Sequence, residues 1–114
     1  MTGMPLTGLA LAGLMLTAAA PVSQGMDIVE HGTGSEASAC MSCHGAKLEG
    51  NPALKAPALA GLPAATVLAR LAHYAGPDGH NAAMRAVATA LNQPERTAVA
   101  NYIASLPKAA ARPQ

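Results

Sequence analysis

Two cysteines and a histidine are the residues of this chain best suited to chemistry. Cys40 and Cys43 are the only cysteines, two residues separate them, and His44 follows directly. A thiol pair at this spacing with an adjoining histidine is typical of the attachment site of a c-type haem. In such a site each sulfur is bonded to a vinyl group of the porphyrin, and the imidazole is an axial ligand of the iron. The motif therefore predicts a covalently bound haem.

Two other uses of a Cys-x-x-Cys pair fit the sequence less well. A structural zinc site needs four Cys or His ligands, and the remaining candidates, His73 and His80, are spaced more widely than the second ligand pair of a zinc finger. A thioredoxin-like redox pair belongs to a βαβ unit with Val/Ile-rich strands. This chain has Ala-rich helical patterns instead, so haem attachment is the main interpretation.

The composition also favours a protein built around a cofactor. The chain has 114 residues, enough for one small domain, with no Phe, no Trp and two Tyr. Aromatic side chains bury about 150–250 Å² each, so their scarcity predicts a thin hydrophobic core that needs an additional stabilising element. We expect the haem-free chain to be mostly unfolded, and a cooperative thermal transition of that chain would contradict this.

The charge pattern predicts no nucleic-acid partner. All seven Lys and Arg and all six Asp and Glu residues fall at or after Asp27, for a net charge of +1. They form neither a basic stripe nor an acidic tail. Residues 108–114, rich in Pro and Ala, are predicted to be a flexible, solvated C-terminal tail.

Residues 1–25 are predicted to be a signal peptide. They contain no charged side chain, and an apolar stretch from Leu6 to Leu16 is followed by small residues. We expect cleavage between Ala19 and Met26 and a periplasmic location in a bacterium. Because the segment begins without Lys or Arg, a start further upstream or a retained membrane anchor stays open, although the apolar part is shorter than the roughly 20 residues of a spanning helix. Contact with a membrane is expected only if the segment is uncleaved.

Helical patterns separated by Gly and Pro fill residues 26–107, which we expect to be one domain. No segment has the alternation of a strand, so the fold class is all-α, with about four short helices and long loops. The expected helices run from Asp27 toward Cys40, from Pro63 to Ala75, from an N-cap at Asn81 to Leu91, and from a capping box of Asn92 and Glu95 to Leu106. Residues 45–63 are predicted to be a long irregular loop along one edge of the haem.

The second axial ligand of the iron stays open on residue logic alone. Met41 lies within the attachment motif, on the same side of the ring as the proximal histidine, and Met26 lies at the predicted mature terminus. Met84 is therefore the remaining methionine beyond the signal, and a role as a core residue is also compatible with it. His73 and His80 are the competing ligands.

These motifs resemble those of a known family, the small class I c-type cytochromes of bacteria, and in particular one half of their dihaem periplasmic members. The resemblance spans roughly residues 27–106. The matching elements are, in chain order, Gly32, Cys-Met-Ser-Cys-His-Gly at 40–45, Pro-Ala-Leu-Ala-Gly at 57–61, Leu68, Leu71, Tyr74, Met84, Leu91 and Ala-Asn-Tyr-Ile-Ala-Ser-Leu at 100–106. It implies a cytochrome c fold around one covalently bound haem c.

The resemblance also implies specific contacts. Met84 is expected to be the distal ligand of the iron. The carbonyl of Pro57 is expected to accept a hydrogen bond from Nδ1–H of His44, which fixes the orientation of the ring. The first and last helices are expected to cross where Gly32 allows a close approach to the face of Tyr102.

Three further positions concern the surroundings of the haem. Tyr74, in the Leu-x-x-Leu-x-x-Tyr match, is expected to contact it. Arg70, where the family often has glutamine, is a candidate partner of a haem propionate, with a purely solvent-facing role as the alternative. Glu36 stands four residues before Cys40, where the family usually has an aromatic, which predicts a looser crossing of the first helix.

An iron held on both sides by His44 and Met84 has no open position for a substrate, unlike a catalytic metal centre. The sequence therefore predicts a one-electron carrier and no enzyme, whose redox partner proteins dock transiently at the haem edge. One alternative is a cytochrome subunit of a larger dehydrogenase or oxidase. The other is a five-coordinate haem enzyme or sensor, if Met84 is not a ligand.

Overall fold

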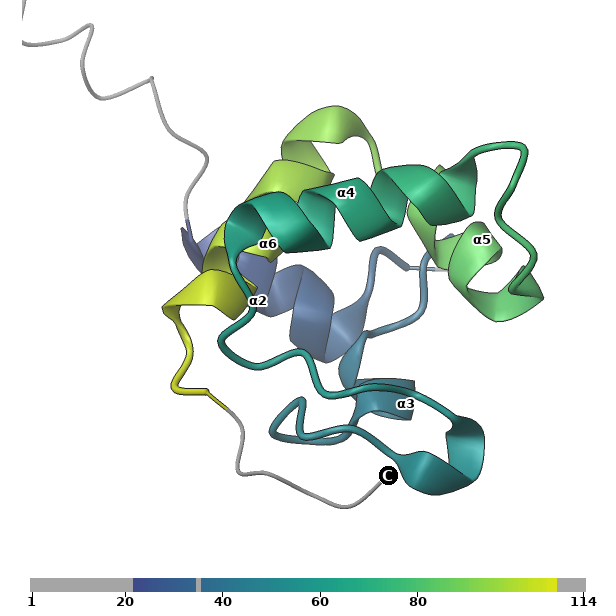
Figure 1. Ribbon diagram of the computed structural model, residues 1–114. Helices are drawn as coiled ribbons and strands as arrows, with labels where there is room; N and C mark the ends of the chain where they lie inside the picture. Colours follow the sequence, from purple (N-terminus) through teal and green to yellow (C-terminus); the bar gives the residue numbers. More distant parts are fainter. Residues whose placement is uncertain (1–21, 35, 109–114) are drawn as a thin grey trace, which may run out of the picture.

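Helices and long loops form the part of the chain that the computed structural model describes, residues 22–34 and 36–108. The elements are α2 (Val22–His31), α3 (Met41–His44), the 3₁₀ turn η1 (Pro52–Leu54), α4 (Ala64–Ala75), α5 (Ala82–Ala90) and α6 (Gln93–Ser105) (Figure 1). Within these residues the only β-type pairing is an isolated bridge between Asn51 and Ala56. The predicted all-α class is confirmed. None of the described helices has the length and apolar character needed to span a bilayer.

The predicted helices after residue 62 are confirmed nearly as expected. Pro63 directly precedes α4. The Asn81 side chain caps α5 by accepting a hydrogen bond from the Met84 amide at 3.0 Å. The expected capping box begins α6, because Asn92 Oδ1 accepts from the Glu95 amide at 2.9 Å and Glu95 Oε1 accepts from the Asn92 amide at 2.8 Å.

The first helix differs from the prediction at both ends. It begins at Val22, so Asp27 lies inside it and is not its cap, and it ends at His31. Gly32, with φ of +75°, terminates it, and its amide donates to the Ile28 carbonyl at 2.8 Å. A left-handed residue just past the last turn is the usual position of a terminating glycine. Glu36 therefore lies beyond the helix.

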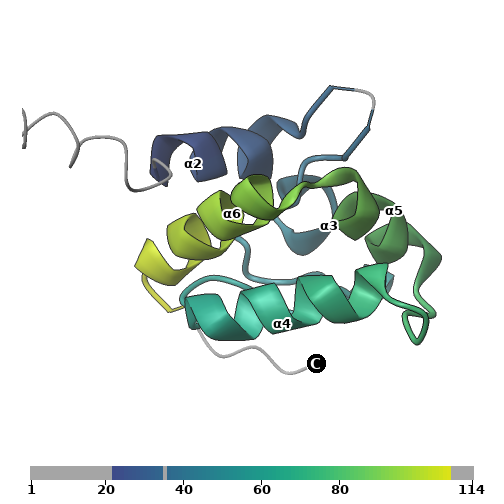
Figure 2. The ribbon, with the colours of Figure 1, turned by 90° about the horizontal axis from the view of Figure 1, so that it is seen from above.

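The crossing of α2 with α6 is close, and it is centred on Gly25. The two helices lie side by side in Figure 2 and make the most extensive helix–helix contact of the described residues. A Cβ at position 25 would overlap the carbonyl of Ala98 and come within 2.9 Å of the Tyr102 Cβ. The predicted crossing at Gly32 was wrong, because a Cβ there would meet residues 37–39 and not α6, whereas Gly25 makes the close approach to Tyr102. The looser crossing predicted from Glu36 stays a prediction.

The core of the described residues is small, as the composition predicts. Its largest fully buried side chains are aliphatic: Val29, Leu48, Leu91, Val99 and Ile103. Alanines supply much of the remainder. Since alanine buries little apolar area, the helices alone bury less hydrophobic surface than those of an average domain of this length.

The loop at 45–63 is held together by its own backbone. The Gly50 amide donates to the His44 carbonyl at 2.8 Å, and the amides of Leu59 and Ala60 both donate to the Leu48 carbonyl, at 2.9 and 3.2 Å. Leu48 is buried and has a left-handed φ of +54°, a conformation that costs a non-glycine residue about 1–2 kcal/mol. The predicted loop is thus present, with η1 and the β-bridge as ordered parts of it.

Candidate functional site

One cavity brings together the residues that the sequence predicted to bind the haem and its iron, with the competing ligands His73 and His80 outside it. It has a volume of about 450 Å³. Its lining includes all seven predicted site residues, which are Cys40, Cys43, His44, Pro57, Arg70, Tyr74 and Met84. They come from α3, from the loop that follows it, and from α4 and α5, which surround this region in Figure 1. Residues 44 positions apart in the sequence therefore share one site.

The short helix α3 presents the two thiols. The His44 amide donates to the Cys40 carbonyl at 3.0 Å, so one helical turn sets the spacing of the motif. Cys43 is exposed, whereas Cys40 is partly buried, and burial raises the pKa of the Cys40 thiol from its ordinary value of 9.0 to about 11. Reactive cysteines of redox-active pairs have a lowered pKa, so the raised pKa of Cys40 disfavours that use of the pair.

The alternative uses of the cysteine pair find no support in the structure. The two cysteines are not joined to each other in a disulfide. No group of three or more His, Cys, Asp or Glu side chains within residues 22–34 and 36–108 could hold a metal ion. The βαβ unit of a thioredoxin-like protein is likewise missing from these residues, whose elements are helical.

The imidazole of His44 is buried and oriented. Its Nδ1 lies 2.8 Å from the carbonyl oxygen of Pro57, so the contact that the resemblance implies is present. A carbonyl can only accept, and Nδ1 therefore carries the proton. This tautomer leaves the lone pair on Nε2, the atom through which an oriented histidine binds a metal.

The loop contacts hold the Pro57 carbonyl in place from both sides. On one side, Ala56 pairs with Asn51 in the β-bridge, and its amide donates to the Asn51 carbonyl at 3.0 Å. On the other side, the Leu59 amide is bonded to the Leu48 carbonyl. The strained backbone of Leu48 thus serves to fix the acceptor that orients His44.

Met84 is the one described methionine that lines this cavity. Met26, on α2, is 41% exposed, and Met41 lines a different cavity. His73 and His80, the competing ligands, are exposed and do not belong to the lining. The structure therefore brings Met84 to the same cavity as His44 and leaves the other candidates outside it.

The remaining walls of the cavity are mostly apolar. The aliphatic residues that line it are Leu54, Leu59, Leu62, Val67, Leu71, Val87, Leu91, Val99 and Ile103. Charged side chains, those of Glu36, Lys55 and Arg70, also reach it. An apolar chamber with two thiols, an imidazole and a thioether among its lining residues fits a c-type haem, whose macrocycle is apolar and whose iron takes nitrogen and sulfur ligands.

Sequence reasoning missed some of these lining residues. Leu54, 56% exposed on η1, and Lys55, which follows it, had no motif to mark them. Asn81 was predicted as a helix cap but not as part of the site. The capping pattern was the available signal, because a residue three positions before Met84 on the same turn lies near it.

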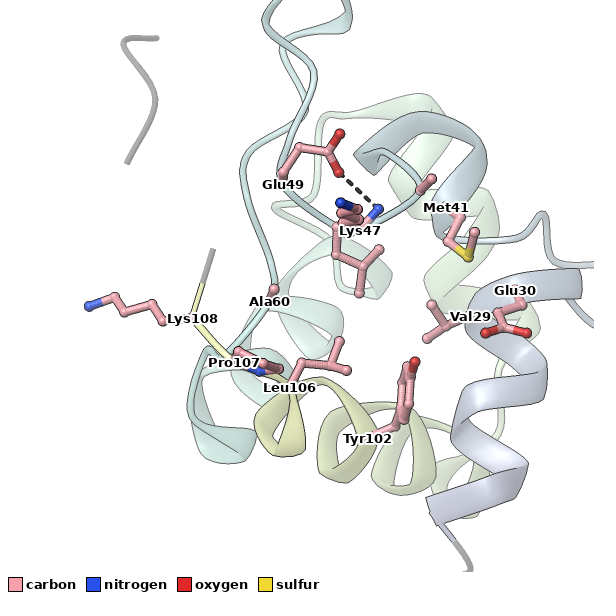
Figure 3. Close-up of a pocket in the computed structure, with 12 residues that line it drawn as sticks. Val29, Glu30, Met41, Lys47, Glu49, Ala60, Tyr102, Leu106, Pro107 and Lys108 are labelled. Atoms are coloured by element: carbon pink, nitrogen blue, oxygen red, sulfur yellow. Dashed lines mark hydrogen bonds between the residues drawn. The ribbon is translucent and has the colours of Figure 1, made fainter. Parts of the chain in front are cut away.

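A second cavity, of about 620 Å³, shares no lining residue with the first. Figure 3 shows the Met41 side chain and Tyr102 directed toward it, with Val29 between them. Charged residues at Glu30, Lys47 and Lys108 also line it. Because Met41 contributes to this cavity and its neighbours in α3 to the other, α3 takes part in both.

Fold and cavity together define a c-type cytochrome, and a comparison with known families agrees. The family model for cytochrome c matches residues 29–107, so the chain belongs to the cytochrome c family. Similarity to cytochromes c4 further supports a class I c-type cytochrome. Membership implies a covalently bound c-type haem.

Relatives agree in sequence and in structure. The chain is 41% identical over 71 residues to the thiosulfate dehydrogenase electron acceptor of Thiomonas intermedia (strain K12), a match that covers 62% of this chain and 33% of the relative. The structure superposes on reduced recombinant cytochrome c4 from Pseudomonas stutzeri with a TM-score of 0.68 and 28% identity, over 75% of this chain and 48% of the other.

Two further solved structures are similar. Thiosulfate dehydrogenase from Marichromatium purpuratum gives a TM-score of 0.73 at 29% identity, over 78% of this chain and 19% of the other. Cytochrome c4 of Acidithiobacillus ferrooxidans gives a TM-score of 0.70 at 28% identity, over 78% of this chain and 52% of the other. The chain thus spans between a fifth and about half the length of these relatives, and corresponds to one part of each.

Proposed function

We propose that this protein carries single electrons through one haem c, with His44 and Met84 as the axial ligands of the iron. The observation that carries the proposal is the shared cavity, because both side chains line it together with the two cysteines of the attachment motif. Membership of the cytochrome c family supports a role in electron transfer and not in enzymatic turnover.

The residues around the cavity suit this role. A haem bound there supplies one-electron chemistry between ferric and ferrous iron. The Pro57 carbonyl keeps the His44 ring in one tautomer and makes Nε2 a better donor. The neutral thioether of Met84 favours the ferrous state, and so does an apolar wall, which disfavours the additional positive charge of the ferric state. With both axial positions taken by side chains, no substrate reaches the iron.

Absorption spectra test the ligand set. The purified wild type is expected to be low-spin in the ferric state, with the methionine-to-iron charge-transfer band, and Met84→Ala is expected to lose that band. Met41→Ala is the matched control, since Met41 lines the other cavity, and it should retain the band. A high-spin ferric wild type would contradict the proposal and favour a five-coordinate haem enzyme or sensor.

Export, location and partners complete the proposal. Removal of the predicted signal peptide, by a cut within the expected range between Ala19 and Met26, would place the protein in the periplasm. There Arg70 and Tyr74 would contact the haem, and redox partners would dock at its edge. Docking of this kind is transient and uses a small surface. Residues 1–21 of the predicted signal peptide and residues 109–114 of the predicted tail lie outside the described residues, whereas residues 22–25 belong to α2.

A second candidate is a permanent cytochrome subunit of a larger dehydrogenase. The relative of Thiomonas intermedia is a thiosulfate dehydrogenase electron acceptor, and the structure matches part of a thiosulfate dehydrogenase. If this chain has that partner, thiosulfate and a purified thiosulfate dehydrogenase should reduce its haem. Gel filtration of native extract distinguishes the two candidates, because a carrier elutes at no more than about 11 kDa, the mass of the uncleaved chain, and a subunit elutes with the larger enzyme.

A further inference from the structure

The helix that carries Met84 is anchored unevenly. Within α5 the only buried residue is Ala88, and Leu91, directly after the helix, is also buried. Both are near the C-terminal end. By contrast, α6 buries four residues and α2 buries three. Met84 and Val87 of α5 are partly buried, pack against the core and line the haem cavity. The fully buried residues thus lie near the C-terminal end of α5, while the N-terminal end packs through Met84.

Hydrogen bonds between side chains and backbone groups also hold the two ends of α5. At the N-terminal end, the Asn81 side chain accepts from the Met84 amide. At the C-terminal end, Arg96 of α6 donates to the Ala88 carbonyl at 2.6 Å and to the Leu91 carbonyl at 3.1 Å. Side-chain hydrogen bonds thus hold both ends of α5, in addition to its packing on the core.

Arg85 provides a tie between α5 and the end of α4. Its guanidinium donates to the Gly76 carbonyl at 2.6 Å, with the Gly79 carbonyl at 3.5 Å. Gly76 is the C-cap of α4, so this side chain spans the turn that joins the two helices, at the outer end of α4 in Figures 1 and 2. A cation is favourable near the C-terminus of a helix, and a charged donor strengthens a hydrogen bond to a carbonyl.

We propose that Arg85 is a positioning residue for Met84: by bonding the Gly76 carbonyl, it keeps the N-terminal end of α5 against α4 and the Met84 sulfur on the iron. This rests on the proposed ligation by His44 and Met84. Arg85 does not line the cavity, so it acts through its neighbour. Without the tie, the first turn of α5 moves away from α4 more often, and Met84 leaves the iron in those excursions.

Titration of the haem-loaded ferric protein with imidazole measures how readily Met84 leaves, because imidazole competes for the same coordination position. Arg85→Ala is expected to bind imidazole roughly tenfold more tightly than the wild type, the effect of losing one charged hydrogen bond. Arg85→Lys keeps a charged donor without the fork of the guanidinium. We expect this variant to bind imidazole about threefold more tightly than the wild type.

Thr89→Ala is the matched control on the same helix. The Thr89 hydroxyl donates only to carbonyls of α5 itself, those of Arg85 at 2.7 Å and Ala86 at 3.3 Å. Its loss removes a hydrogen bond from α5 without untying the helix from α4. The affinity of this variant for imidazole should equal that of the wild type.

The outcomes separate the inference from the proposed function. A wild type without the methionine charge-transfer band overturns the ligation itself. If the band is present and Arg85→Ala binds imidazole as the wild type does, the positioning role is overturned and the ligation stands. The positioning role is also overturned if Thr89→Ala gains as much affinity for imidazole as Arg85→Ala does. Should Arg85→Ala fail to load haem, Arg85→Lys decides, since an unchanged affinity there contradicts the proposal.

Discussion

The α2–α6 crossing and the α4–α5 hairpin are held together in different ways. At the crossing, Gly25 lets two helix backbones touch, and buried aliphatic residues surround the contact. In the hairpin, Arg85 joins α5 to α4, Asn81 caps the first turn of α5, and Arg96 of α6 bonds its C-terminal end. The crossing forms the scaffold, while the hairpin supplies a side chain to the cavity. Damage to the first should therefore lower the stability of the domain most, and damage to the second should cost less stability but weaken the site.

The largest effect is expected at the crossing. In Gly25→Ala the new Cβ overlaps the Ala98 carbonyl, and because the obstacle is backbone, the helices must separate. We expect a loss of about 3 kcal/mol in the free energy of unfolding of the haem-loaded protein, at the upper end for an overpacked contact. Denaturant titration measures it. Gln24→Ala, at an exposed neighbouring position, should change little, and equal stabilities of the two variants would refute the close crossing.

The same contact sharpens the prediction of signal cleavage. A cut after residue 25 would remove the first turn of α2 and Gly25 with it, so we expect the mature protein to begin at or before Val22. The intact mass of the exported, haem-loaded protein gives the cleaved bond. A mature terminus at Met26 would mean that the α2–α6 contact does not need Gly25.

The haem-free chain tests whether the α2–α6 crossing is enough to fold the protein without the cofactor. Part of the core, such as Leu71, Val99 and Ile103, lines the haem cavity, so without haem we expect the chain to be mostly unfolded. Cys40 and Cys43 should then react with iodoacetamide at similar rates at pH 8.5. In the folded arrangement the pKa of Cys40 is about 11, whereas the ordinary value of a cysteine thiol is 9.0. Since only the thiolate reacts, the folded Cys40 would react roughly a hundredfold more slowly than a thiol with the ordinary pKa.

The raised pKa of Cys40 also fixes the sign of the pH dependence. Between pH 9 and 11 the unfolded chain loses the thiol proton and the folded chain keeps it. Any folded haem-free fraction therefore loses stability as the pH rises through this range. Two results would contradict the expectation of an unfolded chain. One is a slow reaction of Cys40 with iodoacetamide, and the other is a cooperative thermal transition whose midpoint falls as the pH rises toward 11.

A smaller effect is expected where α6 holds α5. Arg96→Ala removes the donors to the carbonyls of Ala88 and Leu91, and the free energy of unfolding should fall by about 2 kcal/mol. Arg96→Lys, which lacks the fork, should recover part of this. Denaturant titration of the haem-loaded protein measures both, and a stability unchanged in Arg96→Ala would show that packing alone holds this end of the hairpin.

Residue patterns alone predicted the local features of this molecule, whereas the distant contact of His44 with Pro57 was predicted only through the family resemblance. The attachment motif and the caps at Asn81 and Asn92 depend on neighbouring residues, and the structure confirms the helices that they begin. The bonds of Arg85 and Arg96 join residues five to nine positions apart through the fold, and no periodicity marks them. Gly25 was missed because a composition typical of a signal peptide extends into a helix that packs.

The smallest effect is expected at the N-cap of α5, where the two kinds of contact can be compared directly. Asn81→Ala leaves the Met84 amide without its acceptor, which costs about 1 kcal/mol of stability, whereas Asn81→Asp keeps the acceptor and should lose little. Because the cap holds the turn that carries the proposed ligand, Asn81→Ala should also bind imidazole more tightly in the ferric state than Asn81→Asp. A loss of stability without that change would mean that the cap supports only the helix, and that Met84 is held on the iron by the tie of Arg85 to α4.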